Sequence, residues 1–493
     1  MQMPQSLRDV TAEWLDKALK QGSVIPEDVV VSSIEIQHLN STVGDAHLEG
    51  GLGASGSLLV RLILNYDSLE TSHLPQTVMC KLTCGPRKDF DLQSRVFLNL
   101  ECGDDADWTR REFDFFSKIT PQLTDSNFRS VKIYHSDIID CPNRYVIQRY
   151  LTNTPHNVRS VIIMEDLSGW ESYYGAVEPP KGRVYLCMKN IAALHASFWN
   201  KADELKAQGI QLAQTEISWR KARYSWLFGS LIRWSVSSAD AVTKKVDSFL
   251  NGRWPNHPAT KFHKDDAMPD WLTVAPSEDG TVSPLNDSLC REMLYVFAER
   301  LPNFYQRAMV PLDNAAPQTL IHGDFKSDNH MFRSAHSNDE VVALDFQFTG
   351  LGMVAIELNY FLQLLPSVKS WKDIEDILKV YHKALVENGV NDYNWDTFIH
   401  EFTVFLLDRV MLTVLFASDI DFYIKFWIQI YGPDKRNIVD ILVKSGVMSR
   451  FFVMATSLYM ADKENFMTNE AMSKRNDQDT QSNFLSRILY ALW

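Results

Sequence analysis

Hydrophobic and polar residues alternate along much of the first third of the chain. Between Ser57 and Tyr66, leucine or valine occupies every second position, which predicts a strand with one buried face. Similar runs predict further strands at Val29–Ile36, Thr77–Thr83, Val131–Tyr134, Tyr145–Leu151 and Val161–Met164. A helix is expected at Asp107–Ile119, where apolar residues recur every three or four positions.

After Asp166 the apolar spacing becomes helical. Strand patterns return only around Thr319–His322 and Val341–Asp345. The order predicts an α+β protein in which a sheet-rich N-terminal lobe, residues 1–166, precedes a larger and mostly helical lobe, residues 167–493. A hinge is expected near residues 162–167. The predicted helices are Val184–Trp199, Ile356–Leu365, Trp371–Asn388, Trp395–Ala417 and Asn437–Tyr459.

Composition narrows the class of protein. The 493 residues carry a net charge of −13, which argues against nucleic acid or an anionic membrane as the main partner. Met1–Leu19 lacks the apolar core of a signal peptide, and charges interrupt the longest apolar run, Phe402–Phe416. The six cysteines show no zinc spacing. We therefore expect a cytoplasmic protein with reduced thiols and no membrane span.

The segment His322–Asn329 carries the strongest chemical pattern, followed downstream by Asp345 at the end of an apolar run. Asp324 is expected to orient a substrate hydroxyl and accept its proton. Lys326 would neutralise charge on the phosphate as it is transferred. Asn329 and Asp345 offer the hard oxygen ligands that Mg²⁺ prefers. The pattern predicts phosphoryl transfer, and His322 is expected to brace the loop by hydrogen bonds.

A glycine-rich stretch precedes the strand at Ser57. Gly51, Gly53 and Gly56, with Ser55, form a GxGxxG pattern that leads into a strand and not a helix, which argues against a dinucleotide-binding unit. Such a loop between strands can cover nucleotide phosphates with backbone amides. A plain hairpin turn is the alternative.

Lys81 and Glu112 complete the upstream pattern. Lys81 occupies the middle of a predicted strand and is expected to reach nucleotide phosphates; the alternative is a surface lysine. Glu112 lies on an apolar helix stripe, where a buried carboxylate needs a cationic partner. Lys81 is the expected partner, although Arg110 and Arg111 compete for the role.

The predicted strand at Val161–Met164 runs into a polar turn. In a two-lobed kinase the corresponding link offers backbone groups to adenine. That contact is expected at Met164, Glu165 and Leu167, and an ordinary strand end is the alternative.

Four motifs together resemble the ecdysteroid kinase-like, or CHK kinase-like, branch of the aminoglycoside and choline phosphotransferases. They are HGDxxxxN at 322–329, LDFQ at 344–347, IIMEDL at 162–167 and LHASFW at 194–199. The resemblance covers about residues 40–420. It implies a two-lobed protein kinase-like fold that uses ATP and Mg²⁺. It also implies that Asp324 is the catalytic base, that Asn329 and Asp345 bind the metal, and that Lys81 binds phosphate.

Two features depart from the family pattern. Glu357 stands where such families usually carry an aspartate, and its longer carboxylate could still hydrogen-bond the catalytic loop. Residues 200–310, which normally shape the acceptor site, are long and divergent, so the substrate cannot be transferred by analogy.

The expected activity is phosphorylation of a small-molecule alcohol. Aromatic residues between 219 and 271 could stack on a sterol-like alcohol or surround a choline-like cation, and helix packing is their alternative role. They are Trp219, Tyr224, Trp226, Trp234, Trp254 and Trp271. A nucleotide-binding pseudokinase that acts as a scaffold is the competing function. A protein kinase is disfavoured because no APE-type segment follows Asp345.

Overall fold

The protein is described here from a computed structural model. The structure describes residues 1–38, 57–83, 105–139, 158–214, 316–368 and 371–417, apart from positions 5, 68–70, 174–178, 211, 336–337, 364 and 366 within them. The predicted glycine-rich loop, the strand at 145–151, the aromatic region 219–271 and the helix at 437–459 lie outside the described residues.

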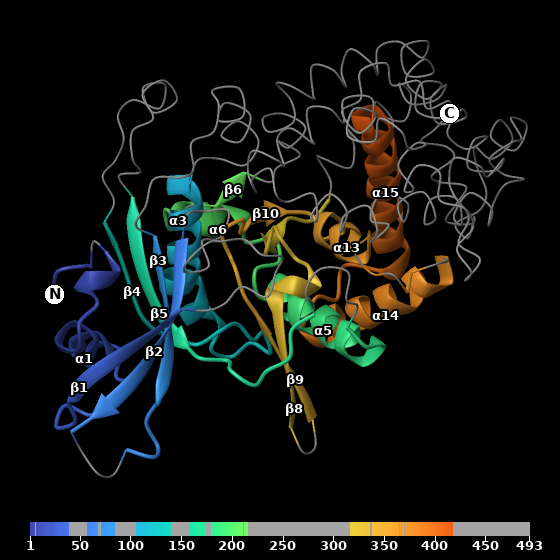
Figure 1. The fold of residues 1–493 in the computed structure, drawn as a ribbon. Helices are drawn as coiled ribbons and strands as arrows, with labels where there is room; N and C mark the ends of the chain where they lie inside the picture. The colour runs from blue at the N-terminus through green and yellow to red at the C-terminus, as the bar shows by residue number, and fades with distance from the viewer. Residues whose placement is uncertain are drawn as a thin grey trace, which may run out of the picture.

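The described N-terminal strands form one antiparallel sheet (Figure 1). The spatial order is β1-β2-β3-β5-β4. The strands are β1 (Val31–His38), β2 (Ser57–Tyr66), β3 (Thr77–Thr83), β4 (Ile133–Ile139) and β5 (Arg159–Glu165). β2 and β3 have the predicted bounds, whereas β1 and β4 each begin two residues later than predicted.

One face of this sheet packs against the N-terminal helix α1 (Ala12–Gln21), which follows the short helix η1 (Leu7–Asp9). The Thr11 hydroxyl accepts a hydrogen bond from the Trp14 N–H at 3.2 Å and so caps α1. Alternate residues of β2 and β3, including Val60 and Cys80, join this buried cluster. Because side chains alternate along a strand, Lys81 lies on the opposite face.

The predicted helix at Asp107–Ile119 has two parts. Its α-helical part, α3, spans Asp105–Asp114, and the π-helix η2 spans Phe115–Ile119 before the short helix η3 (Thr120–Leu123). The predicted apolar stripe is buried as expected, with Trp108, Glu112, Phe115 and Ile119 at most 4% exposed. Phe115 stacks on Phe346 with ring centroids 3.6 Å apart. This contact ties the helix to the residue that follows Asp345.

Helices dominate the second part of the described chain (Figure 1). They are α5 (Lys181–Ser197), α6 (Ala202–Ala207), α13 (Val354–Gln363), α14 (Trp371–Glu387) and α15 (Trp395–Ala417). The sheet-first, helix-later order confirms the predicted α+β class. Within the described residues, no helix is both long and apolar enough to span a membrane.

The expectation that only two strand patterns occur after residue 166 was wrong. A small sheet joins β6 (Ala213–Gln214), β10 (Gly350–Gly352) and β7 (Thr319–Ile321), and a hairpin joins β8 (His330–Ala335) to β9 (Asn338–Ala343). β6 and β10 are too short to show an alternating pattern. β8 begins directly after the motif segment, where polar residues obscured its apolar positions.

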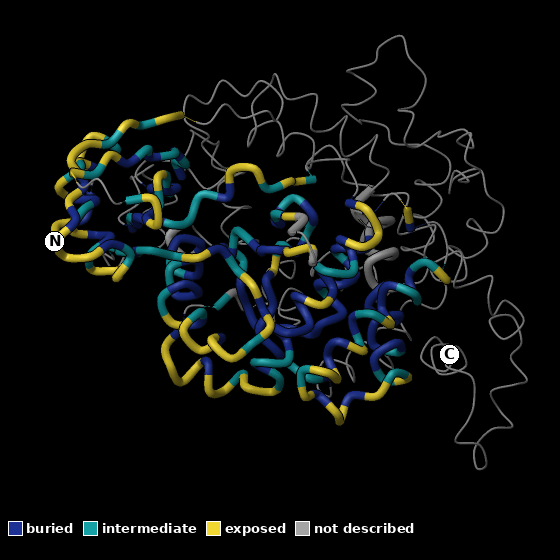
Figure 2. The backbone as a smooth tube through the Cα atoms, turned by 90° about the horizontal axis from the view of Figure 1, so that it is seen from below, coloured by how far each residue is buried: buried dark blue, intermediate teal, exposed yellow. Residues whose placement is uncertain are grey.

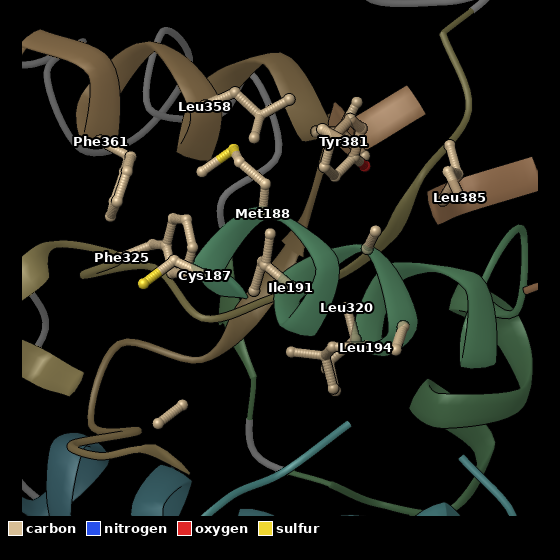
Figure 3. Packing of buried hydrophobic residues seen from close by; sticks show 14 of the residues in the cluster. Cys187, Met188, Ile191, Leu194, Leu320, Phe325, Leu358, Phe361, Tyr381 and Leu385 are labelled. Carbon is tan, nitrogen blue, oxygen red and sulfur yellow. The ribbon is translucent and has the colours of Figure 1, made fainter. Parts of the chain in front are cut away.

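The helical core centres on α5 (Figure 3). Three residues of α5, Met188, Ile191 and Leu194, belong to this core. They pack in one cluster with Leu358 and Phe361 of α13, Tyr381 and Leu385 of α14, and Leu320 of β7. Phe325, from the motif segment, lies in the same cluster. The buried positions in Figure 2 continue through this interior, while exposed residues lie mainly on outer turns. The motif loop is therefore anchored to the core of the helical region.

A buried carboxylate on α15 predicts a pH-dependent stability. Burial raises the pKa of Glu401 to about 7, and the Tyr393 hydroxyl donates a hydrogen bond to it. Because the folded state favours the neutral carboxyl, protonation of Glu401 stabilises the fold. This stabilisation is fully present below the unfolded pKa and is lost as pH rises through about 7. Between pH 5 and 8 the unfolding free energy of the wild type should fall by about 2–3 kcal/mol relative to Glu401→Gln.

Urea unfolding at each pH measures this difference. Glu387→Gln is the control, because the Glu387 side chain is 59% exposed on the neighbouring helix. Its profile should run parallel to that of the wild type. A parallel profile for Glu401→Gln would contradict the assignment.

Candidate phosphoryl-transfer site

The motif loop begins where β7 ends, and its backbone requires glycine at position 323. Gly323 adopts a φ of +84°. A Cβ atom there would lie 2.0 Å from the Phe348 carbonyl oxygen, so neither the conformation nor the space admits a side chain. The tight approach brings the loop carrying Asp324 against the segment that follows Asp345.

His322 joins the two motif segments. Its side chain is fully buried, and its Nε2 atom lies 2.7 Å from the Leu344 carbonyl oxygen. A second link runs from the Leu344 N–H to the Asn329 carbonyl oxygen at 2.9 Å. These bonds provide the bracing that the sequence predicted for His322, and they bring Asp345 beside the loop of Asp324.

Among the described residues, three side chains make hydrogen-bond or ionic contacts with the Asp324 carboxylate. Asn329 Nδ2 donates to its Oδ2 atom at 3.0 Å, Lys326 Nζ lies 3.0 Å from the same oxygen, and the Tyr360 hydroxyl donates to Oδ1 at 3.0 Å. Burial alone would raise the pKa of Asp324, but Lys326 and the Asn329 amide lower it below its usual range. Asp324 is therefore ionised at neutral pH and acts as an acceptor.

Asn329 and Asp345 meet the requirements of a small hard cation. Two bonds hold the Asn329 amide nitrogen on Asp324, to the carbonyl oxygen at 2.8 Å and to Oδ2 at 3.0 Å, so the amide oxygen stays available as a ligand. Asp345 has a φ of +62°, and its buried Oδ1 atom accepts no hydrogen bond. The Lys81 amine lies 3.7 Å from this oxygen. A carboxylate oxygen and an amide oxygen are ligand types that suit Mg²⁺, which is commonly held by one or two carboxylates and by phosphates.

Within the described ranges, no group of three His, Cys, Asp or Glu side chains is arranged to hold a metal. A cation at Asn329 and Asp345 would therefore take its other ligands from phosphate oxygens and water.

Lys81 connects the sheet to this site. Its Nζ atom lies 2.7 Å from Glu112 Oε1 and 3.7 Å from Asp345 Oδ1. Burial alone would lower the pKa of Lys81, but the two carboxylates raise it above its usual value, so the amine remains charged. The structure thus forms the predicted Lys81–Glu112 pair and adds Asp345 as a second neighbour.

The positions expected to contact adenine lie at the end of β5. Met164 pairs with Met79 of β3, on the same sheet face as Lys81. The Glu165 N–H donates to the Lys132 carbonyl oxygen at 2.9 Å, so that N–H is already occupied. Leu167 is buried. Gly51, Gly53, Ser55 and Gly56 lie outside the described residues.

A buried network behind the loop was only partly anticipated. Glu357 accepts a hydrogen bond from the Gly323 N–H at 2.6 Å, so the longer side chain does reach the loop. Its other oxygen lies 2.8 Å from His195 Nε2, and His195 Nδ1 lies 2.8 Å from the Tyr381 hydroxyl. His195 belongs to the LHASFW motif, which gave a signal for its importance but none for its partners.

No role was predicted for Tyr360, which lies in the same helical segment as Glu357. It follows Glu357 by one helical turn on α13, and an amphipathic pattern alone does not separate it from an ordinary packing tyrosine.

One family model matches the segment that carries two of the four motifs. Residues 287–391 match the model of the ecdysteroid kinase-like family. The match includes Asp324, Lys326, Asn329 and Asp345, and it confirms the resemblance predicted from the motifs. No curated protein matches the sequence.

Three solved structures have similarity over most of the chain. An ethanolamine kinase of Plasmodium vivax is 12% identical, covers 87% of this chain and 82% of its own, and gives a TM-score of 0.36. A microcompartment-associated aminopropanol kinase is 10% identical, with 87% of this chain and 99% of its own covered and a TM-score of 0.31. The streptomycin–ATP–APH(2″)-IIa ternary complex is 12% identical over 83% and 95%, with a TM-score of 0.27. These scores are too low to support an argument about substrate, so the family match over residues 287–391 is the informative similarity.

Proposed function

We propose that this protein is a phosphotransferase that uses ATP and Mg²⁺ to phosphorylate the hydroxyl group of a small molecule. The observation that carries the proposal is the approach of Lys81 to Asp345, with Nζ and Oδ1 3.7 Å apart. It brings Lys81 of β3 beside the LDFQ segment at 344–347. The family match over the motif segment supports the proposal independently.

Each residue has a role that its contacts allow. Mg²⁺, when bound, supplies electrophilic stabilisation of the phosphate charge. Asp345 Oδ1 and the Asn329 amide oxygen would hold it. Lys81, kept charged by Glu112, would hold phosphate oxygens of the nucleotide.

Asp324 would serve the acceptor hydroxyl. Its lowered pKa makes it a weak base, so it would orient the hydroxyl first and accept the proton as transfer proceeds. Lys326 pairs with Asp324 at 3.0 Å, and from there it would turn to the charge that develops on the phosphoryl group.

The remaining assignments belong to the same proposal. Gly51, Gly53, Ser55 and Gly56 would cover the phosphates, and Met164, Glu165 and Leu167 would border adenine. The nucleotide would lie between lobes that divide near residue 166. The acceptor would be a sterol-like, choline-like or other alcohol, and the protein would act in the cytoplasm without a membrane span or nucleic acid.

Replacing Asp324 with asparagine should remove transfer but not nucleotide binding. The amide keeps the shape and loses the proton acceptor, so the rate should fall by about 10²–10⁴-fold. A metabolite extract with ATP and Mg²⁺ supplies the acceptors, and mass spectrometry detects the gain of one phosphoryl group. Nucleotide affinity is measured in parallel by calorimetry.

Asp339→Asn, on the exposed part of β9, is the matched control and should retain the wild-type rate. A wild-type protein that binds ATP tightly but phosphorylates no alcohol would instead support the nucleotide-binding scaffold. An Asp324→Asn variant with a normal rate would remove the proposed role of this carboxylate.

Replacing Asp345 with alanine should abolish Mg²⁺-dependent activity, because it deletes one of the two proposed protein ligands. The measurement is the transfer rate across a Mg²⁺ titration, together with Mg²⁺-dependent binding of a fluorescent ATP analogue. Both should lose their Mg²⁺ dependence. Near-normal rates at ordinary Mg²⁺ concentrations would overturn the metal assignment.

A further inference from the structure

Within the part of the chain that the structure describes, the two hydrogen bonds and the ion pair of the Asp324 carboxylate leave one acceptor position open. An ionised carboxylate offers about four lone-pair positions, two on each oxygen. Lys326 and Asn329 occupy both positions of Oδ2, at 3.0 Å each. The Tyr360 hydroxyl occupies one position of Oδ1, also at 3.0 Å. The remaining position, on the oxygen that Tyr360 holds, is the one that a further hydroxyl could use.

Helix α13 fixes Tyr360 relative to the motif loop. Residues three and four positions apart share a helix face, so Glu357, Tyr360 and Phe361 lie together. Glu357 accepts the Gly323 N–H, and Phe361 stacks on Phe325 with ring centroids 4.7 Å apart. One face of α13 therefore contacts three consecutive loop residues, and the tyrosine contact falls on the middle one, Asp324.

The Tyr360 hydroxyl keeps its proton and so remains a hydrogen-bond donor. Burial and the neighbouring charge of Asp324 raise its pKa far above the usual range, so the phenol stays protonated. Hydrogen bonds to an ionised acceptor are the stronger class in proteins. The contact therefore constrains the rotation of the Asp324 carboxylate.

We propose that Tyr360 is a positioning residue that orients Asp324 so that the open acceptor position of Oδ1 faces the substrate hydroxyl. This inference rests on the proposed phosphotransferase function and adds a residue that the motif pattern does not include. The acceptor hydroxyl would approach Asp324 on the Oδ1 side, beside the phenol of Tyr360.

Tyr360→Phe tests the role, because it keeps the ring and removes only the hydroxyl. The kcat for alcohol phosphorylation should fall by about 10- to 100-fold, the range expected for a lost hydrogen bond to a charged group. The KM for ATP should stay within about twofold of wild type, since the hydroxyl that this change removes holds Asp324, the residue proposed to serve the acceptor. An unchanged kcat would overturn the proposal.

Tyr393→Phe is the matched control. Tyr393 also donates its hydroxyl to a buried carboxylate, Glu401, in the helical region, but it lies outside the motif loop. This variant should keep the wild-type kcat. A loss as large as that of Tyr360→Phe would show that removing a buried tyrosine hydroxyl disturbs the fold generally, and would overturn the specific role.

A double-mutant cycle separates positioning from an independent structural effect. If Tyr360 acts through Asp324, adding Tyr360→Phe to Asp324→Asn should change the residual rate by less than about twofold. Losses that multiply across the two variants would contradict the proposal.

Crystal structures of the wild type and Tyr360→Phe provide a measurement that needs no turnover. The Asp324 carboxylate should rotate away from its wild-type orientation when the phenol donor is removed. The same orientation in both structures would refute the positioning contact. If the wild type phosphorylates no alcohol, the proposed function fails, while these structures still decide whether Tyr360 sets the orientation of Asp324.

Discussion

The arrangement of the motif loop depends on the hydrogen bonds of the buried Glu357 carboxylate. One oxygen accepts the Gly323 N–H at 2.6 Å, and the other meets His195, which in turn meets Tyr381. The four residues come from α13, the loop, α5 and α14. Leaving such a group unpaired in the interior would cost several kcal/mol, so the carboxylate holds the loop and its backbone in one place.

That constraint decides how charge is distributed in the site. Gly323 lies too close to Phe348 for any side chain, and His322 bonds to the backbone before Asp345. The two motif segments are therefore fixed to each other by close packing and by hydrogen bonds to backbone groups. The charged residues lie beside these contacts and form two pairs, Asp324 with Lys326 and Asp345 with Lys81. Each of these pairs includes a group that a phosphate or a cation could replace.

Among the described residues, the sheet's charged contact with the site is made by Lys81. Helix α1 packs on one face of the sheet, and the opposite face presents Lys81 beside Glu112 of α3. The stack of Phe115 on Phe346 connects η2, which continues α3, with the segment that carries Asp345. Apolar packing thus sets the distance between Lys81 and Asp345, and the charges alone do not.

The sequence by itself determined the longer strands and helices of the described chain and the reactive residue types. Period-two alternation predicted β2 and β3, and an apolar stripe predicted the burial of Glu112, because these patterns depend only on neighbouring positions. It also predicted the partnership of Lys81 and Glu112. Only the tertiary structure decided that Asp345 joins this pair, that Glu357 reaches Gly323 through a network with His195, and that Tyr360 holds Asp324. Those contacts join segments far apart in the chain, and their geometry follows from helix packing, which no local pattern encodes.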